Sequence, residues 1–168
     1  PQLAHDPEVD LSDLSRRWIT QRLKISDADL VEVLMEILSH SPQVTLLGFY
    51  LGPFARGKTD PWHPNADWIQ DDLLDTVAAW RIVQRLPETS LDEVIREKRE
   101  AVERTRQDRV ALRRELSDAN RSIVEPLLHT LDYAQALFSA LLDLLAGLIA
   151  YRRYQAQGSQ AESQLCRD

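Results

Sequence analysis

The sequence of 168 residues contains only one cysteine and five glycines. The single cysteine, Cys166, excludes a disulfide or a thiolate metal cluster within one chain. The sequence also has neither a Gly-x-Ser-x-Gly element nor a Gly-rich phosphate-binding loop, so nucleophilic catalysis has no local motif. We therefore expect a non-enzymatic protein that needs no cofactor.

The chain also lacks a surplus of positive charge. Its formal net charge is -7, and residues 1–75 hold all of the excess, with 13 acidic and 6 basic side chains, whereas residues 76–168 hold 14 of each. Affinity for nucleic acid comes largely from neutralising phosphates with lysine and arginine. We therefore do not expect a nucleic-acid partner.

A secretion signal is not apparent at the start of the sequence. Residues 1–10 are polar and acidic and lack the apolar run of a signal peptide. Together with the scarcity of cysteine, this leads us to expect a cytoplasmic protein.

Helix-forming residues and helical spacing dominate what is present. Apolar side chains recur at steps of three and four from Leu11 to Ile25, with Asp10 or Ser12 as the cap. Ser26 and Asp29 resemble a capping box and predict a second helix over 27–39, which Pro42 should not allow to extend much further. The sequence therefore predicts an all-α protein whose helices pack into a bundle.

Residues 43–65 are the least helical part of the sequence. They contain three of the five glycines together with clustered aromatic and β-branched side chains, so we expect an irregular aromatic loop or a hairpin. Two readings remain open for this segment: it forms a small core, or its aromatic side chains form a partner surface. The candidate interface residues are Phe54 and Trp62 within this segment and Trp68 just after it.

The second half predicts one long helix over about 91–157, kinked near Pro126. Ser90 and Glu93 form a capping signature, and neither glycine nor proline follows until Pro126. The part before the proline has one sparse apolar stripe, which is typical of a coiled-coil partner.

The part after Pro126 is apolar nearly all round. We expect it to pair with other helices through Leu137, Leu141, Leu144, Leu145 and Leu148. The alternative is a membrane span over 134–151. Asp143 near its centre disfavours insertion by about 3 kcal/mol, and in a buried helix Asp143 would need an arginine partner.

Two pairs of metal-ligating side chains share helix faces, Glu36 with His40 and Glu125 with His129. Their spacing differs from the Glu-x-x-His of carboxylate-bridged metal bundles, so we predict no metal site and keep these four residues as weak candidates.

The predicted organisation has four parts: a polar lead over 1–10, a small helical domain over 11–88, a long helical arm and apolar helix over 89–157, and a flexible tail over 158–168. For such a chain we expect a helical interaction or assembly protein, which pairs with itself or with another helical subunit. The alternatives are a membrane-associated subunit that uses 134–151 and a metal-dependent helical enzyme.

Overall fold

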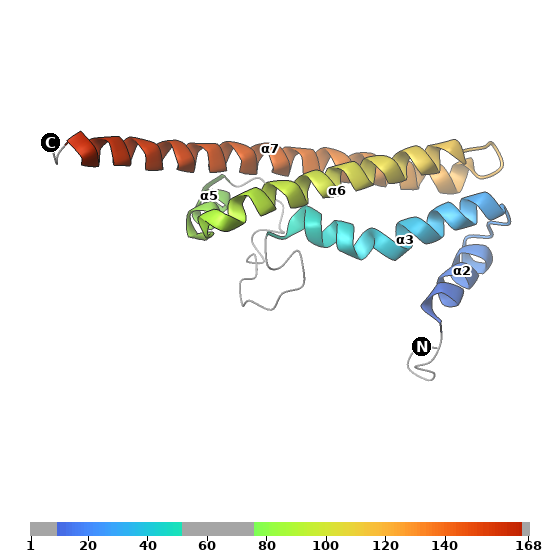
Figure 1. Ribbon diagram of the computed structural model, residues 1–168. Helices are drawn as coiled ribbons and strands as arrows, with labels where there is room; N and C mark the ends of the chain where they lie inside the picture. Colours follow the sequence, from blue (N-terminus) through green and yellow to red (C-terminus); the bar gives the residue numbers. More distant parts are fainter. Residues whose placement is uncertain (1–9, 52–75, 166–168) are drawn as a thin grey trace. The chain divides into compact units, whose positions relative to one another are not determined.

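Every regular element in residues 10–51 and 76–165, the part of the chain that the computed structural model describes, is an α-helix (Figure 1). The helices are α2 (Leu11–Arg22), α3 (Ala28–Phe49), α5 (Thr76–Arg85), α6 (Glu88–Arg114) and α7 (Arg121–Leu165). The predicted all-α class and packing of helices into a bundle are therefore confirmed.

The described residues divide into two compact units. Unit 1 takes its residues from Pro1–Val44 and Arg104–Ala134, and unit 2 takes its residues from Thr45–Glu103 and Gln135–Asp168. Helices α3, α6 and α7 therefore contribute one part of their length to each unit, and each unit is described here by itself.

The local signals at the first two helices are realised almost as predicted. The Oδ1 atom of Asp10 accepts a hydrogen bond of 2.8 Å from the backbone N–H of Ser12, which caps α2. At the start of α3 the cap is Asp27 and not Ser26, because Asp27 Oδ1 accepts from the N–H groups of Asp29 and Leu30. Lys24 has a φ of 57°, and this left-handed conformation ends α2.

The prediction that Pro42 ends the second helix is wrong. Helix α3 continues through Pro42 to Phe49, so its last two turns occupy the start of the segment predicted as an irregular loop or hairpin. Proline lacks the N–H that would bond the carbonyl of Leu38. The hydroxyl of Ser41 donates to that same carbonyl at 3.1 Å, which offsets the loss. Residues 52–65 of the predicted loop lie outside the described residues.

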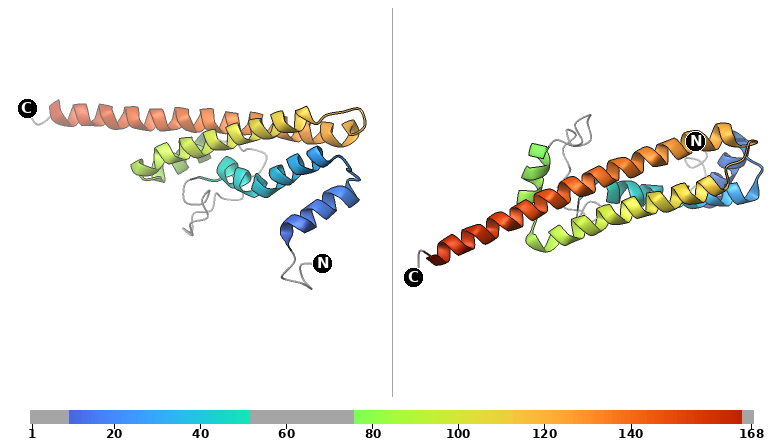
Figure 2. Two further views of the ribbon diagram at one scale, coloured as in Figure 1. Left: turned by 45° about the vertical axis from the view of Figure 1, so that its right-hand side comes forward. Right: turned by 90° about the horizontal axis from the view of Figure 1, so that it is seen from above.

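The predicted single helix over 91–157 is also wrong, because the chain turns at 115–120 and forms the two helices α6 and α7 (Figure 2). The side chain of Asn120 holds this turn. Its Oδ1 accepts from the N–H of Ser117 at 2.8 Å, and its Nδ2 donates to the carbonyl of Glu115 at 2.7 Å. Pro126 lies inside α7, and the helix also continues through Gly158 to Leu165.

The core of unit 1 contains buried aliphatic side chains from all four of its helical segments. Ile19 comes from α2, Leu30 and Leu34 come from α3, Leu112 comes from α6, and Val124 comes from α7. Helix α2 thus enters the core through one buried side chain, and Ile25 follows just after the helix.

The core of unit 2 lies between α5, α6, α7 and the last turn of α3. Gly48 allows the closest approach, because a Cβ atom at this position would lie 2.2 Å from Cε1 of Phe138. The neighbouring Phe49 packs edge-on against the Phe138 ring at a centroid distance of 5.2 Å.

Two cationic side chains cap helix C-termini in unit 2. Lys98, which is 0% exposed, donates to the carbonyl of Leu47 at 2.5 Å and to the carbonyl of Tyr50 at the end of α3. Arg152 donates in the same way to the last carbonyls of α5, including that of Leu86 at 2.7 Å. A cation at the C-terminus of a helix satisfies its free carbonyls and is favoured by the helix dipole.

Candidate binding pocket

An apolar hollow lies in unit 1. This pocket, which we call the α2–α3–α7 pocket, has a volume of about 560 Å³. Its lining residues come from α2 and the residue after it, from α3 and from α7, together with Leu112 of α6, and none of them is charged. It is lined by Trp18, Ile19, Leu23, Leu34, Ile37, Leu38, Ser41, Leu112, Ser122, Ile123, Pro126, Leu127, Thr130 and Leu131.

The polar atoms of the pocket lining offer few contacts to a ligand. The hydroxyl of Ser41 already donates to Leu38, and that of Thr130 donates to the carbonyl of Pro126 at 2.9 Å. Two of the three hydroxyls in the lining, those of Ser41 and Thr130, are therefore engaged with the backbone of their own helix. The pocket can accept apolar groups through the hydrophobic effect and provides little directional polar recognition.

Two large apolar side chains at the pocket leave much of their surface in solvent. Trp18 is 50% exposed and Leu38 is 41% exposed. Exposed apolar side chains that border a concave apolar site are typical of protein interfaces, where tryptophan is enriched among the residues that dominate binding.

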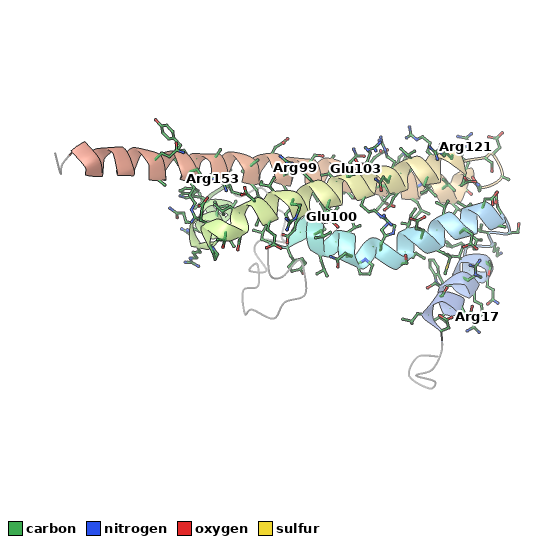
Figure 3. The ribbon with its side chains drawn as sticks, in the orientation of Figure 1. Arg17, Arg99, Glu100, Glu103, Arg121 and Arg153 are labelled. Atoms are coloured by element: carbon green, nitrogen blue, oxygen red, sulfur yellow. The ribbon has the colours of Figure 1, made fainter. Side chains whose placement is uncertain are left out.

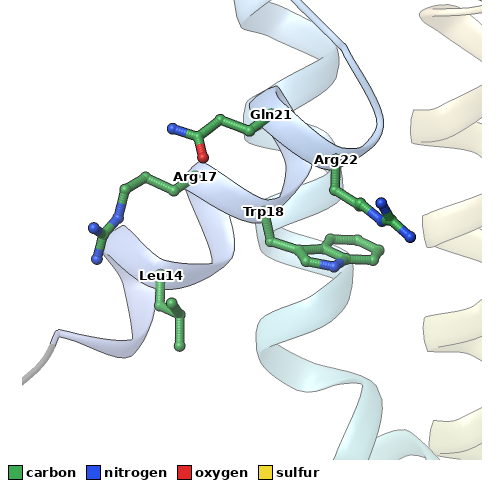
Figure 4. A pocket seen from close by; sticks show the side chains of 5 residues that line it. All are labelled: Leu14, Arg17, Trp18, Gln21 and Arg22. Carbon is green, nitrogen blue, oxygen red and sulfur yellow. The ribbon is translucent and has the colours of Figure 1, made fainter. Parts of the chain in front are cut away.

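Helix α2 presents a second, more polar hollow beside the first. This hollow of about 330 Å³ is lined by Leu14, Arg17, Trp18, Gln21 and Arg22 (Figure 4). Trp18 therefore lines both hollows, and the side chains of Arg17 and Arg22 point to opposite sides of α2 (Figure 4).

A polar cluster joins α3 to α6 in unit 1. Nε2 of His40 lies 2.9 and 2.8 Å from the two carboxylate oxygens of Asp108, and Nη2 of Arg104 donates to Nδ1 of His40 at 3.0 Å. Because arginine can only donate, Nδ1 accepts and the proton is on Nε2, which donates to Asp108. The same Arg104 atom also bonds Glu36 at 3.2 Å.

Three of the four weak metal candidates contact an arginine side chain, and the fourth is exposed. Glu36 and His40 share Arg104, Glu125 forms an ion pair of 3.2 Å with Arg121, and His129 is exposed. Among the described residues no group of three or more His, Cys, Asp or Glu side chains is placed to hold a metal ion.

Asp132, one turn beyond His129, has its own cation. Arg109 donates to Asp132 Oδ1 at 2.6 Å, and this hydrogen bond lowers the pKa of that carboxyl. The contact joins α6 to α7 within unit 1.

The leucines proposed from sequence as interface residues lie in unit 2. Leu141 and Leu145 are both 0% exposed and belong to the core of the unit, so a partner could reach only the partly buried Leu137, Leu144 and Leu148 around them. Phe54, Trp62 and Trp68 lie outside the described residues. The sequence analysis did not single out Trp18 or Leu38 as site residues, although Trp18 was part of the apolar stripe of α2.

The apolar part of α7 meets the length and composition of a membrane span over Arg121–Gly158, and only 22% of its most apolar window is buried. Asp143 is exposed, so the expected buried arginine partner is not needed. The basic residues that follow the apolar run have partners in unit 2. Arg152 bonds α5, and Arg153 pairs with Glu88 at 2.9 Å (Figure 3).

Comparison with known proteins adds no assignment: no family model matches the chain, and neither a curated protein nor a solved structure matches it.

Proposed function

We propose that the chain is a non-enzymatic helical interaction or assembly protein, in which unit 1 receives an apolar segment of a protein partner. The observation that carries this proposal is the α2–α3–α7 pocket, an apolar hollow of about 560 Å³ with the half-exposed Trp18 at its border. The partner is a second copy or another helical subunit.

Burial of the exposed part of Trp18 would contribute to the affinity for a partner. A tryptophan side chain buries at most about 250 Å², so covering the exposed half of Trp18 removes about 125 Å² from water. At about 25 cal/mol per Å² this contributes about 3 kcal/mol to binding. The exposed part of Leu38 adds to this at the same border.

Photocrosslinking tests the proposal directly. Leu38 is replaced by the photoreactive residue p-benzoylphenylalanine, and the adducts formed in cells that express the chain are identified by mass. We expect one adduct of defined mass, which is lost when Trp18→Ala is added. The matched control places the same residue at Tyr154, which is 73% exposed in unit 2 and should give no such adduct.

Two outcomes of this experiment would contradict the proposed function. If position 38 gives no adduct and sedimentation at micromolar concentration shows a monomer, the chain is not an assembly protein of this kind. If the adduct forms at Tyr154 and not at position 38, the pairing surface is α7, as the sequence analysis proposed.

A second candidate function, membrane association, is supported by the apolar segment of α7, which has only 22% of its most apolar window buried. Flotation of the purified protein with phosphatidylcholine vesicles distinguishes the two. Association with vesicles that is lost on Leu144→Asp would favour the membrane, because a carboxylate on the partly buried face of α7 opposes insertion.

A further inference from the structure

The local charge of α2 differs from that of the chain. The helix contains three arginines and one aspartate, a net charge of 3 - 1 = +2, in a protein of net charge -7. Arg16 is neutralised by Glu32 at 2.5 Å. Within residues 10–51 and 76–165, neither Arg17 nor Arg22 has a carboxylate at ion-pair distance.

These two arginines line the polar hollow next to Trp18 (Figure 4). Arg17 makes only a long hydrogen bond of 3.4 Å, from Nε to the carbonyl of Asp13 within its own helix. A ligand that covers Trp18 from the α2–α3–α7 pocket therefore meets an uncharged, largely apolar lining and one guanidinium group on each side of α2. Guanidinium groups bind carboxylates more strongly than neutral acceptors.

We infer that the segment received by the α2–α3–α7 pocket is an amphipathic helix with acidic residues beside its apolar face, and that its carboxylates pair with Arg17 and Arg22. This inference rests on the proposed function and adds the chemical class of the partner. Bulky apolar side chains at helical spacing would enter the pocket beside Leu38, and acidic residues on both sides of that apolar face would reach Arg17 and Arg22.

The shape of the site favours a peptide helix over a bilayer. A concave hollow of about 560 Å³ bordered by Trp18 and Leu38 accepts side chains that project from a helix, whereas a bilayer surface meets convex amphipathic faces. An anionic membrane would still be attracted by Arg17 and Arg22, so the experiment includes it.

Fluorescence anisotropy with two designed peptides tests the inference. Both have about 14 residues, which is four helical turns, with leucines at helical spacing on one face. One has glutamate at the flanking positions and the other has lysine at the same positions. Each is titrated with the full chain, with Arg17→Glu/Arg22→Glu, and with Leu38→Glu.

The matched control is Arg81→Glu/Arg99→Glu, which makes the same change in net charge at two exposed arginines of unit 2. Circular dichroism confirms that each variant keeps its helix content. Flotation with vesicles of phosphatidylcholine and phosphatidylglycerol is measured for the same proteins.

We expect the acidic peptide to bind the full chain at least about tenfold more tightly than the basic peptide, the result of two ion pairs at a partly exposed border. Reversal of Arg17 and Arg22 should remove this preference, the control reversal should leave it unchanged, and Leu38→Glu should abolish binding of both peptides.

Three outcomes would overturn the inference: equal binding of the two peptides, an equal effect of the control reversal, or binding to the vesicles that depends on Arg17 and Arg22 while neither peptide binds. In each case an adduct from the photoreactive residue at position 38 would still support the proposed function. Loss of both the adduct and the peptide binding would remove both proposals.

Discussion

The buried amino group of Lys98 should make the stability of the protein depend on pH. Burial lowers the pKa of Lys98 from 10.5 to about 7, and the adjacent carboxylate of Glu97 raises it only in part. Below pH 7 the amine is charged in the folded and unfolded states. Between about pH 7 and 10.5 the unfolded chain binds the proton and the folded chain does not, so stability increases with pH in that window.

The magnitude follows from linkage. Between pH 6 and pH 9 the folded chain loses the Lys98 proton while the unfolded chain retains it. At about 1.4 kcal/mol per pH unit above the folded pKa, the free energy of unfolding should rise by about 3 kcal/mol. Lys98→Met removes this titration and leaves the other groups of the chain in place, so the rise should appear in the difference between the full chain and the variant.

Urea unfolding followed by circular dichroism at pH 6, 7.5 and 9 measures the difference. The control Lys24→Met makes the same substitution at an exposed lysine. A flat difference for Lys98→Met would refute the reasoning, since it would mean that the carbonyls of Leu47 and Tyr50 keep the ammonium form at pH 9. If Lys98→Met does not fold, proton uptake on unfolding of the full chain at pH 8.5, measured by calorimetry, gives the same information.

Three further predictions follow from single contacts. Gly48→Ala should lower the free energy of unfolding by about 2 kcal/mol, because the added methyl group overlaps the packed ring of Phe138. Gly147→Ala should raise the free energy of unfolding by about 1 kcal/mol, because the added methyl group meets nothing within 4 Å and alanine favours the helix. The urea midpoints of the two variants measure both effects. Asn120→Ala should cost about 2 kcal/mol, because two hydrogen bonds at the buried turn are lost, and an unchanged melting temperature would contradict this role. A double-mutant cycle with His40→Ala and Asp108→Ala should give a coupling energy of about 1 to 3 kcal/mol, and additive effects would show that the pair is energetically independent.

Helices whose apolar spacing and caps are local could be predicted from the sequence. The stripe of Leu11, Leu14 and Trp18 requires only neighbours within three turns, and Asp10 caps the next residues of its own chain. The all-α class follows from such signals summed along the chain. Hence α2 and the start of α3 were predicted to within a few residues, apart from the choice of Ser26 in place of Asp27 as a cap.

The errors share a physical cause, which is that one side chain overrides a strong local signal. Pro42 normally ends a helix, but the Ser41 hydroxyl replaces the missing donor. The opposite happens at Asn120, where no glycine or proline marks a turn and the amide side chain supplies two hydrogen bonds that the helix would otherwise make. Both residues are common in many other contexts, so neither is a signal until the backbone around it is known.

The pocket could not be predicted, because its walls come from segments that lie about 100 residues apart in the sequence. The structure also shows that one of these walls is held by fewer stabilising contacts than the others. The α3 wall is tied to α6 by the partly buried His40–Asp108 contact, and the α7 wall is tied to α6 by Arg109. Helix α2 contributes one buried side chain, and its ion pair between Arg16 and Glu32 is exposed, so it adds little stability. Of the three walls, α2 therefore has the lowest cost of local opening. A partner that covers Trp18 would supply the apolar contacts that α2 lacks, and binding at this pocket would stabilise α2 more than any other described helix of unit 1.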